Sequence, residues 1–302
     1  MSASPTVTIR PARAEDFPQV QAICAQIWEG RDYVPDVWAQ WLADTEGELA
    51  VLTVGDAVAG VAKLTRLGAG EWWLEGLRID PAQRNRGYGM MLHRHLVAAC
   101  RARGGGVARF ATGSTNIAVH KMAHEIGFKR RAAFVRYEAG PQAHGAEEFR
   151  PLAPAEAAQV WDFLNGSEYF EAAQRSFELP RRWTWMVATE ARLLDLLHAG
   201  QVYGWFGDRR ATALDGVVIA HPPSVDDHDG QSRLSLAYFD VTVGNLAIAA
   251  QMFRAVTGQA GVDKVQFRTL SRPERKVALE QAGYRRDSDY ETWLFALEIE
   301  GA

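Results

Sequence analysis

Cysteine is scarce in this 302-residue chain, which contains only Cys24 and Cys100. Each lies in a helix-like apolar pattern, and neither has a C-x-x-C or similar ligand spacing, so a disulfide framework and a thiolate zinc site are excluded. The segment from His221 to Asp229 contains metal-ligand residue types, but its prolines and irregular spacing favour a solvated loop. We therefore expect no metal centre.

Long hydrophobic runs are also missing, because no stretch approaches the ~18 consecutive apolar residues typical of a membrane-spanning helix. The N-terminal sequence MSASPTVTIRPA lacks the positively charged end and the apolar stretch of a signal peptide. These absences lead us to expect no membrane attachment and a cytoplasmic location.

An excess of positive charge is absent as well. Lysine and arginine number 33 against 37 acidic residues, which gives a formal net charge of −4 and a pI of about 6.1. Without a global basic field, we expect no nucleic-acid partner. What is present, 47% hydrophobic, 23% charged and 10% aromatic residues, is typical of a folded globular protein. The length is about twice the ~150 residues of an average domain, so two domains are expected.

Three segments of the first half recur, in the same order, in the second half. Each pair shares a local pattern: a strand ending in Arg-Pro, two apolar runs around a Gly-Asp turn, and a helix stopped by glycine before a strand. The pairs are residues 7–23 with 147–164, 48–64 with 201–220, and 122–131 with 279–287. The chain is therefore interpreted as two copies of one unit, domain 1–143 and domain 144–302.

Within the first copy, strands alternate with amphipathic helices, which predicts an α/β fold with a mixed sheet covered by helices on both faces. The expected elements are a strand at 7–10, helices at 14–28 and 35–43, three strands ending at residue 79, a helix at 88–103, a strand at 107–112, a helix at 116–126 and a strand at 128–138. The second copy repeats this order with an extra helical region at 168–197 and a polar loop at 221–232.

The loop that precedes the helix at residue 88 is the most informative segment. It reads Arg84-Asn85-Arg86-Gly87-Tyr88-Gly89, and an apolar helical pattern follows at once. A glycine-containing loop that opens a helix points free backbone N–H groups at an anion, and arginines add charged donors. The Met90-Met91-Leu92 continuation excludes a P-loop and a dinucleotide fingerprint. An ordinary turn is the alternative.

This loop resembles the Arg/Gln-x-x-Gly-x-Gly/Ala signature of the GCN5-related N-acetyltransferase (GNAT) superfamily. The preceding Gly76-Leu77-Arg78-Ile79-Asp80-Pro81 is similar to the family's fourth strand, and residues 116–128 resemble its Asn…Gly-Phe element. The resemblance implies a tandem GNAT protein that binds acetyl-coenzyme A, with pantetheine beside the fourth strand where it splays from the fifth. The implied coenzyme-binding residues are Leu77, Arg78, Ile79, Arg84, Asn85, Arg86, Gly87, Tyr88, Gly89, Met90 and Asn116.

Two catalytic roles follow from the same resemblance. Glu75 interrupts an apolar strand, where an unpaired carboxylate is costly, and it lies at the height of the family's proton acceptor, so it resembles a general base. Alternation would place Trp73, Leu77 and Ile79 on the face of Glu75. A structural ion pair with an arginine such as Arg78 is the alternative.

The family's general acid is often a tyrosine, which this chain replaces by Ala123. His120 and His124, one turn apart on the same helix, could supply a proton near neutral pH, and His120 is our candidate. The alternative is that both are surface histidines.

The stretch between the first two helices usually lines the acceptor pocket in this superfamily. Here Asp32 could hold an ammonium, Tyr33 or Trp38 could stack on a ring or cation, and Trp73 completes the expected substrate set. Short pieces of this stretch also look like the histidine N-acetyltransferase-like subgroup, which suggests a small amine or free amino acid as acceptor. Core packing of the tryptophans is the alternative.

The second copy lacks the arginines and paired glycines at its corresponding crossing, residues 239–247, so we expect a degenerate copy without a coenzyme site. The resulting prediction is an N-acetyltransferase that moves acetyl from acetyl-coenzyme A to a primary amine by direct attack. A non-catalytic acyl-coenzyme A sensor or interaction module is the alternative, because Ala123 leaves the acid position vacant. Both a monomer and a homodimer remain open.

Overall fold

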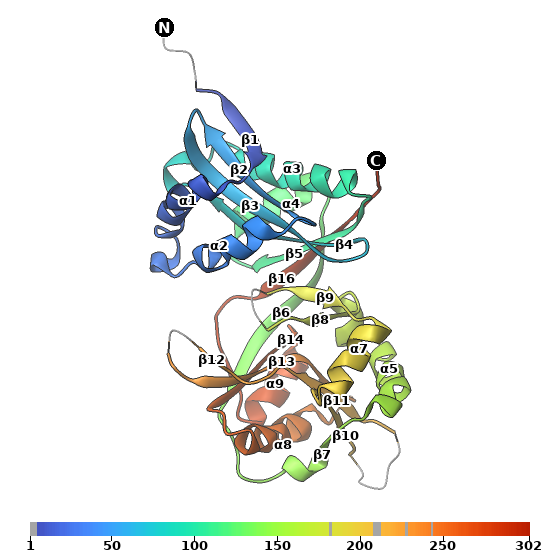
Figure 1. The fold of residues 1–302 in the computed structure, drawn as a ribbon. Coiled ribbons are helices and arrows are strands. Elements are labelled where there is room, and N and C mark those ends of the chain that lie inside the picture. Colours follow the sequence, from blue (N-terminus) through green and yellow to red (C-terminus); the bar gives the residue numbers. More distant parts are fainter. Residues whose placement is uncertain (1–4, 181–182, 208–212, 227–228, 243) are drawn as a thin grey trace. The chain divides into compact units, whose positions relative to one another are not determined.

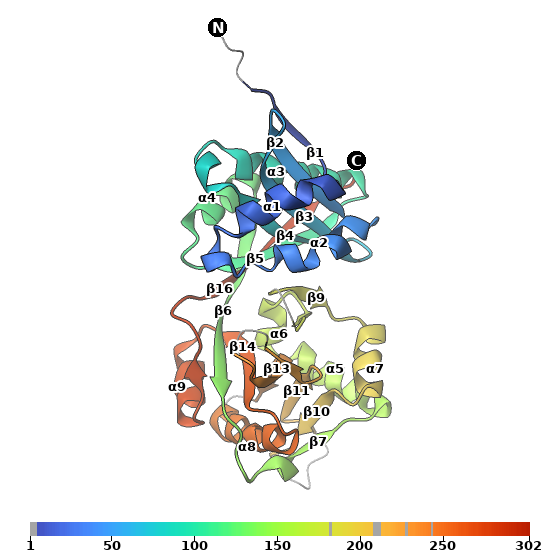
Figure 2. The ribbon, with the colours of Figure 1, turned by 60° about the vertical axis from the view of Figure 1, so that its left-hand side comes forward.

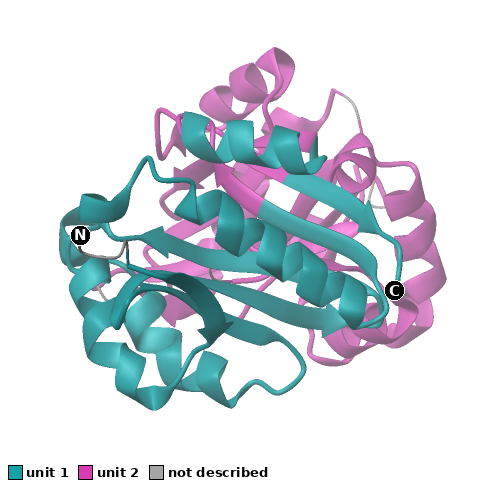
Figure 3. Ribbon diagram, turned by 90° about the horizontal axis from the view of Figure 1, so that it is seen from above, with its two compact units in different colours: residues 1–110, 117–129, 295–302 teal, residues 111–116, 130–294 magenta. Residues whose placement is uncertain are grey.

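The chain divides into two compact units in the computed structural model, which describes residues 5–180, 183–207, 213–226, 229–242 and 244–302. Unit 1 comprises residues 1–110, 117–129 and 295–302, and unit 2 comprises residues 111–116 and 130–294. The units interleave in sequence, because the last residues of the chain return to unit 1 (Figure 3). The predicted domains, residues 1–143 and 144–302, are defined by the sequence repeat and not by compactness. Their bounds stay a prediction.

Unit 1 contains a mixed sheet between two layers of helices (Figure 1). Its strand order is β1-β2-β3-β4-β5-β16, in which β1 to β4 pair antiparallel and β4 pairs parallel with β5. The elements are β1 (Val7–Pro11), α1 (Phe17–Cys24), α2 (Val34–Ala43), β2 (Glu48–Val54), β3 (Ala57–Gly68), β4 (Glu71–Ile79), α3 (Tyr88–Ala102), β5 (Gly106–Gly113), α4 (Ile117–Ile126) and β16 (Thr292–Ile299).

Different helices cover the two faces of this sheet. On one face, α1 and α2 bury Val20, Trp38 and Trp41 against Val51 and Val61. On the other face, α3 is amphipathic and buries Leu92, His93, Leu96, Val97 and Cys100. The expected helix at 14–28 is shorter than predicted, because 3-10 turns at Ala14–Asp16 and Trp28–Gly30 flank α1.

Unit 2 repeats the architecture, with the order β6-β14-β13-β11-β10-β7. Helices α8 and α9 lie on one side of its sheet, and α5 and α7 lie on the other (Figure 2). The elements are β6 (Lys129–Ala139), β7 (Phe149–Pro151), α5 (Ala157–Asn165), α6 (Glu168–Ala172), β8 (Ser176–Glu178), β9 (Trp185–Val187), α7 (Glu190–His198), β10 (Val202–Trp205), β11 (Gly216–Ala220), β12 (Ser224–Val225), β13 (Ser232–Val241), α8 (Leu246–Gln259), β14 (Lys264–Leu270), α9 (Pro273–Gln281) and β15 (Arg285–Arg286).

The α/β fold with helices on both faces is confirmed, but one expected helical region is wrong. Residues 168–197 contain α6 and α7 separated by the antiparallel β8–β9 pair, in which Ser176 faces Val187. Pro180 lies between the two strands, and proline in a helix interior removes a hydrogen bond and clashes with the preceding turn. The expected hairpin at 201–220 forms as β10 and β11, with its turn residues 208–212 outside the described residues.

Candidate active site

The start of α3 has the geometry of an anion site. Asp80 begins the preceding 3-10 turn and accepts a hydrogen bond from the Ala82 N–H at 2.9 Å. Asn85 and Gly87 both adopt left-handed φ values, of 62° and 80°, which brings the chain round into the helix. The N-cap residue of α3 is Gly87, which has no side chain to accept a hydrogen bond from the first turn. The first N–H groups of an uncapped helix carry partial positive charge and are available to a ligand.

Side chains around this helix start add to its positive character. Arg84 and Arg86 are exposed, as is Asn85, and neither arginine forms an ion pair within the described residues. Tyr88 is buried and Met90 is half-buried. Among the described residues, a Cβ at Gly87 would meet nothing within 4 Å, and the nearest side-chain atoms to a Cβ at Gly89 would be those of Leu77, Ile79 and Met122, at 3.8 to 3.9 Å. The protein's own atoms therefore leave open space beside the loop.

A β-bulge in β4 determines which side chains share a face. Lys63 of β3 pairs with Glu75, but Val61 pairs with Arg78, so β4 contains one extra residue at this point. Gly76 makes the bulge possible. It has a φ of 64°, and a Cβ there would lie 2.5 Å from the Trp41 ring.

The bulge makes the expected face assignment wrong beyond Glu75. Arg78 lies on the face of Glu75 and Trp73, towards α1 and α2, because Val61 and Lys63 are two residues apart on β3. Leu77 and Ile79 instead lie near the first turn of α3. An isolated glycine inside an apolar strand signals a bulge, and Gly76 was that signal.

Strands β4 and β5 separate early, as expected. Their parallel pairing covers only Glu71 to Trp73 on β4, although β4 continues to Ile79. The Asp80 N–H donates to the Ala59 carbonyl on β3, at 2.9 Å. Because successive backbone N–H groups of a strand point to opposite edges, the Ile79 N–H points into the fork between β4 and β5.

Glu75 is partly buried on the α1–α2 face, and the Thr65 hydroxyl donates to its Oε1 at 2.6 Å. Lys63, its cross-strand partner, is fully buried and pairs with Asp44. Burial lowers the pKa of the Lys63 ammonium, although the carboxylates of Asp44 and Glu75 act in the opposite direction. Glu75 is therefore a carboxylate held by a hydroxyl, near a buried cation.

Asp32 is engaged by Arg78. The Arg78 Nε and Nη2 donate to both carboxylate oxygens, at 2.5 and 2.9 Å, and the Asp32 side chain is fully buried. Burial depresses the pKa of the Arg78 guanidinium, but the hydrogen bonds and charge of Asp32 outweigh this and raise it. Trp28 and Tyr33 stack on the guanidinium at 4.5 and 5.5 Å. Direct contact of Asp32 with a substrate ammonium remains a prediction, one that this pairing weakens.

The expected aromatic substrate residues differ in exposure. Tyr33 is half-buried and meets Trp41 edge-on at 6.0 Å. Trp38 is 5% exposed and packs on Phe17, and Trp73 is 1% exposed. Trp38 belongs to the core beneath α1 and α2, which is the packing alternative for that residue.

The candidates around α4 lie in different environments. His120 is half-buried, with its ring 5.9 Å from that of Phe295, and His124 is exposed. Asn116, in the short unit 2 segment before α4, donates to the Thr112 hydroxyl at 3.1 Å. Ala123, at the usual tyrosine position, is fully buried, so a side chain there would face the core rather than solvent.

His93 is a buried titratable group that sequence reasoning missed. It lies edge-on to the rings of Phe110 and Phe128, at 5.2 Å from each, and burial lowers its pKa to about 4. Its Nε2 is buried and has no hydrogen-bond partner among the residues that the structure describes. The signal was its place on the apolar stripe of α3, next to Leu92 and Leu96.

Known proteins share part of this sequence. Residues 9–128 match the model of the acetyltransferase (GNAT) family. Histidine N-acetyltransferase of Oreochromis niloticus is 30% identical over 93 residues, which cover 30% of this chain and 28% of that protein. The human protein named "Probable N-acetyltransferase 16" is 32% identical over 84 residues, covering 28% and 23%. The matched region thus spans about a quarter of these relatives.

Solved structures resemble the whole chain. A GCN5-related N-acetyltransferase from Sphaerobacter thermophilus superimposes with a TM-score of 0.63 at 14% identity, covering 98% of this chain and 97% of that one. A tandem GNAT protein from the clavulanic acid biosynthesis pathway gives 0.53 at 15%, covering 98% and 100%. The fold is therefore a tandem GNAT fold. Within the described part of the chain, no helix has the length and apolarity to cross a membrane, and no three metal-ligating side chains gather at one place.

Proposed function

We propose that this chain transfers an acetyl group from acetyl-coenzyme A to a primary amine of a small molecule or amino acid, because residues 9–128 match the model of the acetyltransferase (GNAT) family. The observation that carries the proposal is the fork between β4 and β5, with the uncapped start of α3 and Glu75 on the same stretch of unit 1. The similarity to histidine N-acetyltransferase supports an amino acid as the acceptor.

The coenzyme would bind along the loop and the fork. The free N–H groups of Tyr88, Gly89 and Met90 would hold the pyrophosphate, and the exposed Arg84 and Arg86 would add charged donors. Asn85 and Gly87 shape the loop through their left-handed backbone. Pantetheine would lie beside the backbone of residues 77–79, which lie beyond Trp73, the last residue of β4 that pairs with β5. Asn116 completes the proposed set.

Acetyl transfer would proceed by direct attack. The amine nitrogen bonds to the thioester carbonyl carbon, its proton passes to Glu75 directly or through water, and the carbon–sulfur bond breaks to release the coenzyme A thiolate. The Ile79 N–H, which points into the fork, would stabilise the developing oxyanion. Thr65 would hold Glu75 in place, since it donates to the carboxylate.

The leaving thiolate needs little help from an acid. A free thiol has a reference pKa near ~8.5, so the thiolate is a tolerable leaving group near neutral pH. His120 is the proposed proton donor where one is needed, because its imidazole is half-buried on α4. Tyr33, Trp38 and Trp73 would shape the acceptor side, and Asp32 would act there through Arg78.

Unit 2 would bind no coenzyme, because the crossing into α8 offers no arginine to a phosphate. Val243 of this crossing lies outside the described residues. Asn245, at the start of α8, donates to the Thr242 hydroxyl at 3.2 Å rather than flanking a glycine pair. We place this activity in the cytoplasm, in a monomer or homodimer.

Release of free thiol from acetyl-coenzyme A tests the proposal. The purified chain is incubated with acetyl-coenzyme A and an amine panel of free histidine, other amino acids, polyamines and peptide N-termini. Thiol release that depends on one class of amine, with the acetylated product identified by mass spectrometry, is the expected result. Binding of acetyl-coenzyme A without thiol release for any amine would support the sensor alternative instead.

A further inference from the structure

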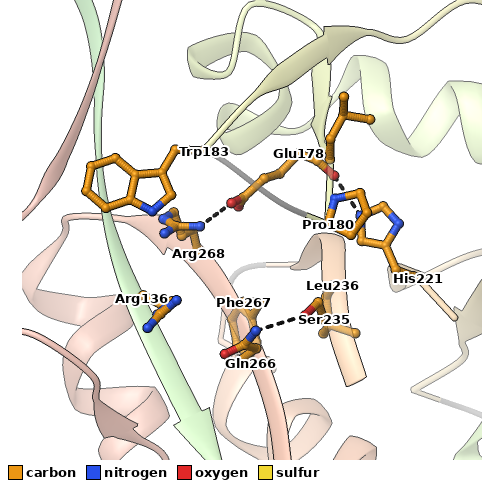
Figure 4. Close-up of a pocket in the computed structure, with 11 residues that line it drawn as sticks. Arg136, Glu178, Pro180, Trp183, His221, Ser235, Leu236, Gln266, Phe267 and Arg268 are labelled. Atoms are coloured by element: carbon orange, nitrogen blue, oxygen red, sulfur yellow. Dashed lines mark hydrogen bonds and ion pairs between the residues drawn. The ribbon is translucent and has the colours of Figure 1, made fainter. Parts of the chain in front are cut away.

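A cavity of about 120 Å³ lies within unit 2, at the end of the β13–β14 pairing (Figure 4). The parallel register ends where Ser235 faces Gln266, and both line the cavity. Polar and aromatic side chains reach it from several elements. They are Arg136 of β6, Glu178 of β8, Trp183, His221, and Arg268 of β14.

Two guanidinium groups lie side by side in the wall of this cavity. Arg136 and Arg268 are directly opposite each other in the antiparallel β6–β14 pair. Like charges at such positions are unfavourable unless anions balance them. Arg268 is 7% exposed and pairs with the buried Glu178, and Arg136 donates to Asp287 at 2.6 Å.

These partners leave donors unused. Arg268 uses Nη1 for Glu178 and Nε for Thr292, and Arg136 uses Nε and Nη2 for Asp287. Within the described part of unit 2, Nη2 of Arg268 and Nη1 of Arg136 make no hydrogen bond. Because a guanidinium carries five N–H donors and no acceptor, what remains is suited to an acceptor with two oxygens.

The other walls set the size and character of a ligand. Trp183 stacks on Arg268 at 5.4 Å, and Leu179, Pro180 and Leu236 supply apolar surface. Gln266 donates to the Ser235 hydroxyl at 2.9 Å, and the His221 Nε2 lies 2.8 Å from the Glu178 carbonyl oxygen. At ~10–15 Å³ for each water-sized group, the cavity holds on the order of ten such groups.

We propose that this cavity is a second ligand site, for a small carboxylate of about ten non-hydrogen atoms with an apolar or aromatic body. The carboxylate lies between Arg136 and Arg268, and its body lies against Trp183 and Leu236. The site is independent of acetyl transfer, because it uses only unit 2 residues and none of those assigned to the coenzyme.

Isothermal titration calorimetry of the full chain tests this site, with matched carboxylates and amines. The carboxylate probes are butyrate and 3-phenylpropionate, and the amine probes are butylamine and 3-phenylpropylamine. Arg136→Gln removes one guanidinium without stranding a buried charge, since Asp287 is partly exposed. Arg150→Gln is the matched control, because Arg150 forms an exposed ion pair with Glu156 in the same unit and does not line the cavity.

We expect saturable 1:1 binding of a carboxylate probe, at least tenfold weaker in Arg136→Gln and within twofold of wild type in Arg150→Gln. Ser235→Leu, which fills the cavity, should abolish this binding and leave acetyl-coenzyme A binding unchanged. The site is overturned if no carboxylate probe saturates, if the amines bind as well as the carboxylates, or if Arg136→Gln and Arg150→Gln behave alike. None of these outcomes bears on thiol release by unit 1.

Discussion

The two units contain the same fork, but they differ in what surrounds it. In unit 1, β4 and β5 pair over Glu71 to Trp73, and in unit 2, β13 and β14 pair over Arg233 to Ser235. Each central strand also contains a one-residue bulge against its antiparallel neighbour. A helix follows each central strand, α3 in unit 1 and α8 in unit 2. Backbone geometry alone therefore does not distinguish the proposed coenzyme site of unit 1 from the corresponding place in unit 2.

Side chains make the difference on the faces next to the forks. The face of β4 presents Glu75, held by Thr65, and Arg78, held by Asp32. On β13, Tyr238 is 1% exposed and packs among the rings of Tyr169, Phe170 and Phe177. Asp240, two residues further along β13 and on the same face, is buried and accepts hydrogen bonds from Ser167 and Arg275. The carboxylate of this strand is therefore held in a structural pair, and we infer that unit 2 kept the fold without the transferase chemistry.

Among the side chains that distinguish unit 1 from unit 2, Glu75 should have the largest effect on activity when it is replaced. Glu75→Gln keeps the shape and removes the base, so kcat should fall by ~10²–10⁴-fold while acetyl-coenzyme A binds as before. Glu46→Gln is the control, because Glu46 forms an exposed ion pair with Arg66 in the same unit. Initial rates at saturating acceptor and calorimetric affinity provide the check. A rate within twofold of wild type would remove Glu75 from the mechanism.

The buried pair of Asp32 and Arg78 should be the next most sensitive point. Asp32→Asn leaves the Arg78 guanidinium buried without its counter-ion, which should lower the free energy of unfolding by about 3 kcal/mol in urea titrations. Glu29→Gln, in an exposed pair with Arg31, should change it by less than ~0.5 kcal/mol. A stable Asp32→Asn variant with a raised KM for the amine would instead assign Asp32 to the substrate ammonium.

Helix α3 of unit 1 buries the titratable His93, whereas α8 of unit 2 buries Phe253, which does not titrate. His93 should therefore make unit 1 sensitive to acid. The pKa of His93 is about 4 in the folded chain, whereas an unperturbed histidine has a pKa of 6.5. At a pH between these values, the unfolded chain binds a proton that the folded chain does not. Stability is therefore lost as the pH falls. From pH 7 to pH 5, His93→Phe should lose about 2 kcal/mol less unfolding free energy than wild type. The exposed His124→Gln should lose as much as wild type, and equal losses in all three proteins would contradict the account.

The arginines at the start of α3 should have the smallest of these effects. The double variant Arg84→Gln, Arg86→Gln removes two exposed charges that have no ion-pair partner in the described chain, so the fold should be unaffected. The affinity for acetyl-coenzyme A should fall about tenfold, because two charge-assisted contacts to phosphate are lost. Arg94→Gln, exposed further along α3, should bind normally. An equal loss in Arg94→Gln would indicate only a general charge effect.

Local patterns predicted the elements of the site well. The helix start at Tyr88 and the α2 region follow from glycine, proline and apolar spacing within a few residues. Features that depend on distant pairing were missed. The faces beyond Gly76 depend on the register with β3, and the partner of Arg78 lies 46 residues away. The return of residues 295–302 to unit 1 likewise has no local signal.

The stoichiometry of acetyl-coenzyme A binding tests most directly the claim that only one of the two forks holds the coenzyme. Isothermal titration calorimetry of the wild-type chain should give one site per chain, and that single site should weaken in the Arg84→Gln, Arg86→Gln variant. Two sites per chain, or one site whose affinity is unchanged by the two substitutions, would contradict the account.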